Sequence, residues 1–86
     1  MTQKLFYGIH RGIVDAANDP QRLGRLRVRV PDVLGPTETR WAAPCVPDPN
    51  RSAATFTPPA AGTLVWIAFE GGDISRPVWI GFPMKR

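Results

Sequence analysis

The segment Arg25-Leu26-Arg27-Val28-Arg29-Val30 alternates charged and apolar residues without interruption. Because successive side chains of a β-strand point to opposite faces, this alternation predicts a strand with one buried face and one face in water. Leu26, Val28 and Val30 are then expected to point inward and the three arginines outward. The strand should end near Val30, since Pro31 cannot donate a hydrogen bond to a neighbouring strand.

The segments on either side of this strand predict hairpins. Residues 6–15 are rich in β-forming residues and precede turn-forming residues at 18–24, so they should pair with the arginine strand. Residues 63–69 form a nearly continuous apolar run, which is typical of a strand covered on both faces. A glycine turn leads from this run to a last strand at residues 77–82, and a weaker strand is expected around residues 40–43.

The chain has 86 residues, which allows one small domain, expected over residues 1–86 with a core at about 6–82. Ten prolines and eight glycines indicate a turn-rich domain, and the proline-rich stretch at about 44–59 predicts a long irregular loop. Five short strands without a helical period predict an all-β fold, a small five-stranded antiparallel barrel of the OB type. An SH3-like barrel has the same length and strand number, so periodicity alone does not separate the two.

The chemistry needed for an enzyme or a metal site is missing from the sequence. The chain has one histidine, one cysteine and two serines, and it contains none of the common nucleophile, phosphate-binding or zinc-protease motifs. Glu70 and Asp73 flank a glycine turn, where acidic residues usually serve as solvated turn formers. We therefore expect no catalytic residues, no metal and no cofactor, with His10 as a structural strand residue and Cys45 as a small buried one.

No apolar run reaches the ~20 residues that a membrane span requires, and the first residues lack the pattern of a signal peptide. We therefore expect that this chain makes no stable membrane insertion and carries no export signal.

Arg25, Arg27 and Arg29 give the strand an exposed cationic face, for which three roles are open. The arginines can be solvated, can pair with carboxylates of a neighbouring protein, or can contact phosphates as in OB modules that bind single-stranded nucleic acid. Nucleic-acid binders place aromatic residues on the same face, whereas the alternate positions here are apolar and point inward. This difference favours a protein partner.

The large aromatic residues have two possible roles. Trp41, Trp66 and Trp79 are most simply core residues. Trp79, Phe82 and Phe56 are also candidates for contacts between subunits, because a small barrel has difficulty covering so many large apolar groups.

Several segments together resemble one family. They are Gly24-Arg25-Leu26-Arg27-Val28-Arg29-Val30-Pro31, the stretch Val65-Trp66-Ile67-Ala68-Phe69-Glu70-Gly71-Gly72-Asp73, and Arg76-Pro77-Val78-Trp79-Ile80-Gly81. Their order resembles the OB-fold domain of phage baseplate spike proteins, of baseplate assembly protein V and of the VgrG proteins of type VI secretion. The resemblance spans about residues 7–82.

The resemblance implies a homotrimeric barrel in the baseplate of a virion tail or an equivalent injection machine. Its implied partners are a hub protein above and a needle or tip protein below. Family members usually continue into a β-helical needle, whereas this sequence stops four residues after Phe82, so the needle is expected to be a separate protein or the barrel an adaptor ring. We expect a structural component that connects hub and tip, and the alternative is a single-stranded nucleic-acid-binding module.

Overall fold

The computed structural model describes residues 4–46 and 57–84. Five strands and two short helical segments follow one another in this part of the chain. They are β1 (Ile9–Ala16), β2 (Leu26–Arg29), α1 (Pro31–Leu34), β3 (Thr39–Pro44), β4 (Leu64–Phe69), the 3-10 helix η2 (Glu70–Gly72) and β5 (Pro77–Gly81). Residues 47–56, at the centre of the loop expected over 44–59, lie outside the described residues.

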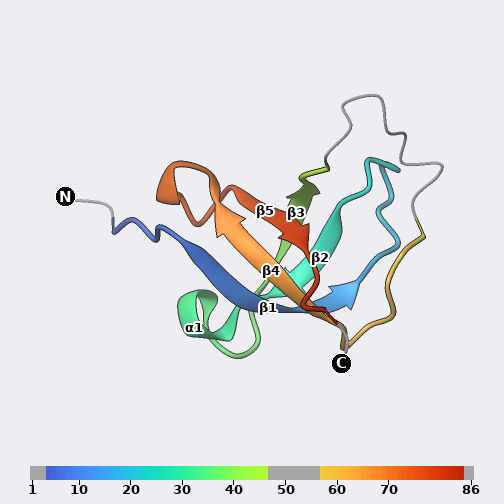
Figure 1. Cartoon of the computed structure of the whole chain (residues 1–86), viewed down its shortest axis with the longest axis horizontal. Coiled ribbons are helices and arrows are strands. Elements are labelled where there is room, and N and C mark those ends of the chain that lie inside the picture. Colours follow the sequence, from blue (N-terminus) through green and yellow to red (C-terminus); the bar gives the residue numbers. More distant parts are fainter. Residues whose placement is uncertain (1–3, 47–56, 85–86) are drawn as a thin grey trace.

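The strands form a closed barrel in the order β1-β2-β3-β5-β4, which confirms the predicted OB-type architecture (Figure 1). Four neighbouring pairs are antiparallel, as predicted, but β3 and β5 run parallel. Strand directions cannot alternate all the way around a ring with an odd number of members. A closed barrel of five strands must therefore contain one parallel pair, and the sheet is mixed.

β1 is the longest strand, and it pairs with β2 on one side and with β4 on the other. The pairing with β4 runs through five residue pairs, from Ile9 with Ala68 to Ile13 with Leu64. On the β2 side the register shifts between Val14 and Ala16, where β1 carries a bulge. By contrast, β3 and β5 share only two residue pairs, Ala43 with Val78 and Pro44 with Trp79.

The core fills the inside of the barrel with one side of each strand. Leu26, Val28 and Val30 are fully buried, as the alternation in the sequence predicts. β1, β3, β4 and β5 contribute the remaining buried hydrophobic residues, Val14, Ala42, Val65, Ile67, Phe69 and Trp79. At one end of the barrel Val33 and Leu34 of α1 and Phe6 from the N-terminal segment pack against this core.

Three local expectations were wrong. Residues 32–39, expected only as a connection after the arginine strand, begin within the helix α1, where the fixed φ of Pro31 suits the first turn. β4, expected to be covered on both faces, is buried on alternate residues only, and Leu64 is 47% exposed on its outer face. Cys45, expected to be buried, is exposed, because it follows the end of β3 rather than lying within the strand.

Candidate functional site

The three arginines predicted as interface candidates lie together on the outside of the barrel. β2 turns Leu26 and Val28 into the core, so Arg27 and Arg29 project outward, and Arg25 does the same just before the strand begins. Their side chains are 24%, 45% and 37% exposed for Arg25, Arg27 and Arg29 respectively. We call Arg25, Arg27, Arg29 and the neighbouring Trp41 the arginine face.

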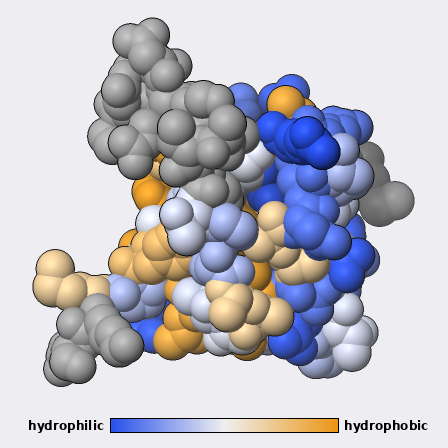
Figure 2. Space-filling model, turned by 90° about the vertical axis from the view of Figure 1, so that its right-hand side faces the viewer, coloured by the Kyte–Doolittle hydropathy of each residue, from blue (hydrophilic) through white to orange (hydrophobic). Residues whose placement is uncertain are grey.

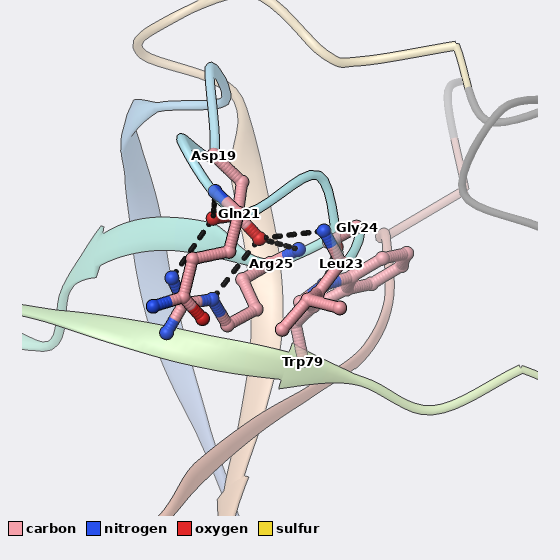
Figure 3. A network of polar contacts seen from close by, with 6 residues as sticks. All are labelled: Asp19, Gln21, Leu23, Gly24, Arg25 and Trp79. Atoms are coloured by element: carbon pink, nitrogen blue, oxygen red, sulfur yellow. Dashed lines mark hydrogen bonds and ion pairs between the residues drawn. The ribbon is translucent and has the colours of Figure 1, made fainter.

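Arg25 is fixed by Asp19, which organises the whole β1–β2 loop (Figure 3). The guanidinium makes two parallel bonds to the carboxylate, from Nε to Oδ2 at 3.0 Å and from Nη2 to Oδ1 at 2.8 Å. The backbone N–H groups of Gln21, Leu23 and Arg25 also donate to this carboxylate, at 2.9, 3.0 and 3.3 Å. One carboxylate therefore fixes both the turn and Arg25, the first of the three arginines.

These contacts stabilise the charged form of Asp19. The Arg25 guanidinium holds the pKa of Asp19 well below its usual range, and the three backbone donors act in the same direction while burial opposes them. Asp19 in turn raises the pKa of Arg25. Because the Asp19 side chain is only 4% exposed, its negative charge is directed at Arg25 and the loop rather than at solvent.

Arg27 and Arg29 share a second carboxylate, that of Asp15 on β1. Nε of Arg27 donates to Oδ2 of Asp15 at 2.9 Å, and its Nη2 lies 2.8 Å from the same oxygen. Arg29 is held much less closely, with Nε 4.0 Å from Oδ1 of Asp15. That Nε atom is buried and has no hydrogen-bond partner among the described residues.

Trp41 joins this face from the neighbouring strand. β3 pairs with β2 so that Trp41 lies directly opposite Arg27. The guanidinium carbons of Arg25 and Arg27 lie 5.1 and 5.9 Å from the centre of its ring, which is cation–π distance. Trp41 could not be placed beside the arginines from the sequence, because the register that brings it there depends on the pairing of β2 with β3.

The aromatic interface candidates are placed differently. Trp79 lies in the core at 6% exposure, and its indole Nε1 donates to the carbonyl of Gly24 at 3.1 Å. Phe82 is 41% exposed, and its ring centre lies 5.6 Å from that of Trp79. Phe56 lies outside the described residues. The structure therefore brings Phe82, but not the indole of Trp79, to the surface, and the interface role of all three residues stays a prediction.

A second surface, on the outer side of β1, β4 and β5, is largely apolar. Across these strands Ile9, Ala68 and Val78 lie in one row, and Leu64 lies next to Ile13. Ile9, Leu64 and Ile80 are 58%, 47% and 40% exposed. We call Ile9, Leu64, Trp66, Ala68, Val78 and Ile80 the apolar face. Arg11 is the charged residue at this face, and its guanidinium lies over the Trp66 ring at 5.0 Å.

Hydrophilic and hydrophobic residues are distributed unevenly over the side of the molecule seen in Figure 2. Hydrophilic residues gather on the right of this view, whereas hydrophobic residues lie mainly towards its left, among residues of intermediate hydropathy. An exposed sheet face normally carries polar side chains, so the apolar face is the exception that requires an explanation.

Contacts near the glycine turn hold Asp73 and Glu70, and aromatic rings surround His10. Asp73 accepts hydrogen bonds from the backbone N–H and hydroxyl of Ser75, and Glu70 pairs with Arg76 at 3.7 Å. His10 is half-buried between the rings of Phe6 and Phe69, and its Nε2 has no hydrogen-bond partner in the described part of the chain. Within residues 4–46 and 57–84, no group of three or more His, Cys, Asp or Glu side chains is placed to hold a metal ion.

The same two ranges contain no helix with the length and apolar character needed to cross a bilayer.

Comparison with known proteins identifies the family of this barrel. A search of curated proteins found no match. A family model described as the type VI secretion system/phage-baseplate injector OB domain matches residues 10–83, which include all five strands except Ile9 at the start of β1. The match agrees with the closed five-stranded barrel. The chain therefore belongs to the family of injector OB domains found in type VI secretion systems and phage baseplates.

Proposed function

We propose that this chain is a non-enzymatic structural component of a contractile injection machine, a trimeric barrel that connects the hub ring to a needle or tip protein. Membership of the injector OB family supports a place in the baseplate of a phage tail or an equivalent machine. The trimer and the connecting role go beyond the family and rest on the surface of the barrel.

The apolar face carries this proposal. Three adjacent strands present Ile9, Leu64 and Ile80 outward at 40% exposure or more, next to the partly covered Trp66. Leaving such a face in water is unfavourable, since each square ångström of apolar surface removed from water contributes about 25 cal/mol. Copies of one small barrel that cover this face would gain stability that a chain of 86 residues has difficulty obtaining from its own core.

The proposed task is mechanical. A barrel whose strands close into a ring has no free sheet edge at which a neighbouring chain can pair and distort it. Such a body can transmit axial force and keep a tip centred while the sheath contracts. This role requires stable contacts with neighbouring proteins and no chemical step.

Light scattering coupled to size-exclusion chromatography tests the trimer. We expect a mass of about three times the 9.5 kDa of the chain. Ile80→Lys places a charge on the apolar face and should shift the protein to monomers. Leu23→Lys is the matched control, because Leu23 is 54% exposed and belongs to the β1–β2 loop rather than to β1, β4 or β5.

A single monomer peak for the unmodified chain at concentrations of hundreds of micromolar would contradict the trimer. Equal dissociation by Ile80→Lys and Leu23→Lys would remove the apolar face from the interface. Circular dichroism of each variant shows whether the barrel itself is still folded.

A further inference from the structure

The arginine face has a geometry that matches one kind of ligand. Side chains on one face of a strand repeat every two residues, roughly 6.6 Å along the chain, and Arg25, Arg27 and Arg29 follow this repeat. An extended peptide laid along β2 has the same repeat. Carboxylates at alternate residues of such a peptide would therefore meet the arginines one for one.

The charges on this face leave room for a further carboxylate. Three guanidinium groups face the two carboxylates of Asp15 and Asp19, so one positive charge is uncompensated. Of the three arginines, Arg29 has the weakest contact with a carboxylate. Asp15 lies 2.8 Å from Arg27 but 4.0 Å from Arg29, and the buried Nε of Arg29 has no hydrogen-bond partner in the described residues.

Because that Nε is buried, a carboxylate from solvent would bind the exposed part of the Arg29 side chain, where a charge-assisted hydrogen bond is favourable. The Arg29 side chain is 37% exposed, so a carboxylate can approach its guanidinium from solvent.

The side chains of Arg25 and Arg27 are already ordered by their neighbours. Asp19 and Asp15 fix the guanidinium planes of Arg25 and Arg27, and Trp41 packs against both. Each guanidinium has five N–H donors, and within the described residues Nε and Nη2 of Arg25 contact Asp19 while Nε and Nη2 of Arg27 contact Asp15. Little conformational entropy is lost when such side chains bind, because they are already ordered.

We propose that the arginine face binds an extended acidic segment of a different protein, with carboxylates at alternate residues and Arg29 receiving one of them. This inference rests on the proposed function, since it names the chemistry of a baseplate partner. A second copy of the chain does not fit, because the acidic residues at positions 15, 19, 32, 38, 48, 70 and 73 include no pair separated by two. A nucleic acid fits less well, because the ring of Trp41, the aromatic residue of this face, already lies against two guanidinium groups instead of being open to a base.

Two synthetic octapeptides test the spacing. One alternates threonine with glutamate, and the other has the same composition with its four glutamates in succession. Titration of the full chain, followed by arginine Nε–H resonances in NMR at low salt, should show tighter binding of the alternating peptide. Equal affinity for both peptides would overturn the proposal.

Two substitutions test the residues. Arg29→Gln should weaken the alternating peptide roughly two- to fivefold, the range of an exposed ion pair. Asp15→Asn should strengthen it by a similar factor, because the competing carboxylate is removed. Arg76→Gln is the matched control, since Arg76 is an exposed arginine that pairs with Glu70 outside the arginine face. An unchanged affinity in Arg29→Gln, or a loss in Asp15→Asn, would contradict the proposal.

A thymidine oligonucleotide of about twenty residues is titrated in parallel. If it binds more tightly than the alternating peptide and loses affinity in Arg29→Gln, the face is a nucleic-acid surface and the proposal is wrong. The oligomeric state is measured separately. A trimer that binds neither peptide would overturn this inference alone, whereas a monomer would contradict the proposed function.

Discussion

At the scale of single residues, Asp19 shows how one carboxylate can shape a loop. It accepts bonds from three backbone N–H groups and from two guanidinium nitrogens of Arg25. Asn18-Asp19-Pro20 was identified in the sequence as turn chemistry, and the turn is present. The pairing of Asp19 with Arg25 was not predicted, because it depends on how the loop folds back onto β2.

The pKa of Asp19 makes stability depend on pH in acid. Because its pKa is lower in the folded protein than in the unfolded chain, the stabilisation is complete above the unfolded value of about 3.9 and is lost progressively as the pH falls below it. Asp19→Asn should therefore lower the free energy of unfolding at pH 7, and the difference from the unmodified chain should shrink between about pH 4 and pH 2.

Urea denaturation at several pH values measures this effect. Asp32→Asn, which removes an exposed carboxylate of α1, is the control for the loss of one negative charge from the chain. A gap between Asp19→Asn and the unmodified chain that stays constant down to pH 2 would contradict the assignment.

Gly12 is a second residue whose role emerged only from the structure. A Cβ atom there would lie 2.8 Å from Cγ1 of Ile67 and 3.2 Å from the carbonyl oxygen of Arg29. Gly12→Ala should therefore destabilise the protein by about 1–3 kcal/mol through overpacking. Gly81→Ala is the matched control, because a Cβ there meets nothing within 4 Å, and its effect should stay within about 0.5 kcal/mol. Equal urea midpoints for the two variants would show that the barrel can relax around the new methyl group.

At the scale of the element, β2 was the most predictable part of the chain. Strict alternation identifies both its limits and its two faces, since burial follows from a period of two. α1 could not be predicted, because four residues are too few to show a helical period. The exposed face of β4 was also missed, since an apolar run in the sequence does not reveal whether a second layer is present to cover it.

The candidate site was likewise predicted only in part. The three arginines were identified from alternation, whereas Trp41 was not placed with them and Trp79 was expected at an interface as well as in the core. Both depend on which strands become neighbours. Arg27 lies opposite Trp41 only because β2 pairs with β3 in one register, and the indole of Trp79 is directed at Gly24 only once the barrel closes.

The two faces of β2 should respond differently to truncation. Leu26→Ala leaves a cavity in the core and should cost about 2–5 kcal/mol. Arg27→Ala removes an exposed ion pair on the same strand and should cost about 1 kcal/mol or less. Thermal and urea unfolding of the two variants at equal protein concentration measures both values. Similar losses for both would contradict the assignment of inner and outer faces.

At the scale of the whole molecule, the barrel divides its outer surface between charge and apolar area. The arginine face lies on β2 and β3, and the apolar face lies on β1, β4 and β5. This division allows copies of the chain to associate through one side while another protein binds the other. It could not be predicted from the sequence, because it follows from the order of strands around the ring.

Self-association predicts that stability depends on concentration. Because a folded assembly is favoured by mass action, the melting temperature of the unmodified chain should rise between about 5 and 500 μM. Ile80→Lys should melt at the same temperature throughout this range, and differential scanning fluorimetry compares the two. A melting temperature of the unmodified chain that does not change with concentration would contradict association through the apolar face.

The short pairing of β3 with β5 has a consequence for how the barrel opens. Two residue pairs join these strands, and one of them includes Pro44, which has no N–H to donate. The backbone N–H of Cys45 donates a further hydrogen bond to the carbonyl of Trp79. Native-state fluctuations should therefore separate β3 from β5 before any other pair of strands. In hydrogen–deuterium exchange the amide of Cys45 should exchange well before the amides at the centre of the β1–β4 pairing. The molecule would then behave as a curved five-stranded sheet with β1 at its centre, closed into a barrel by its weakest pairing.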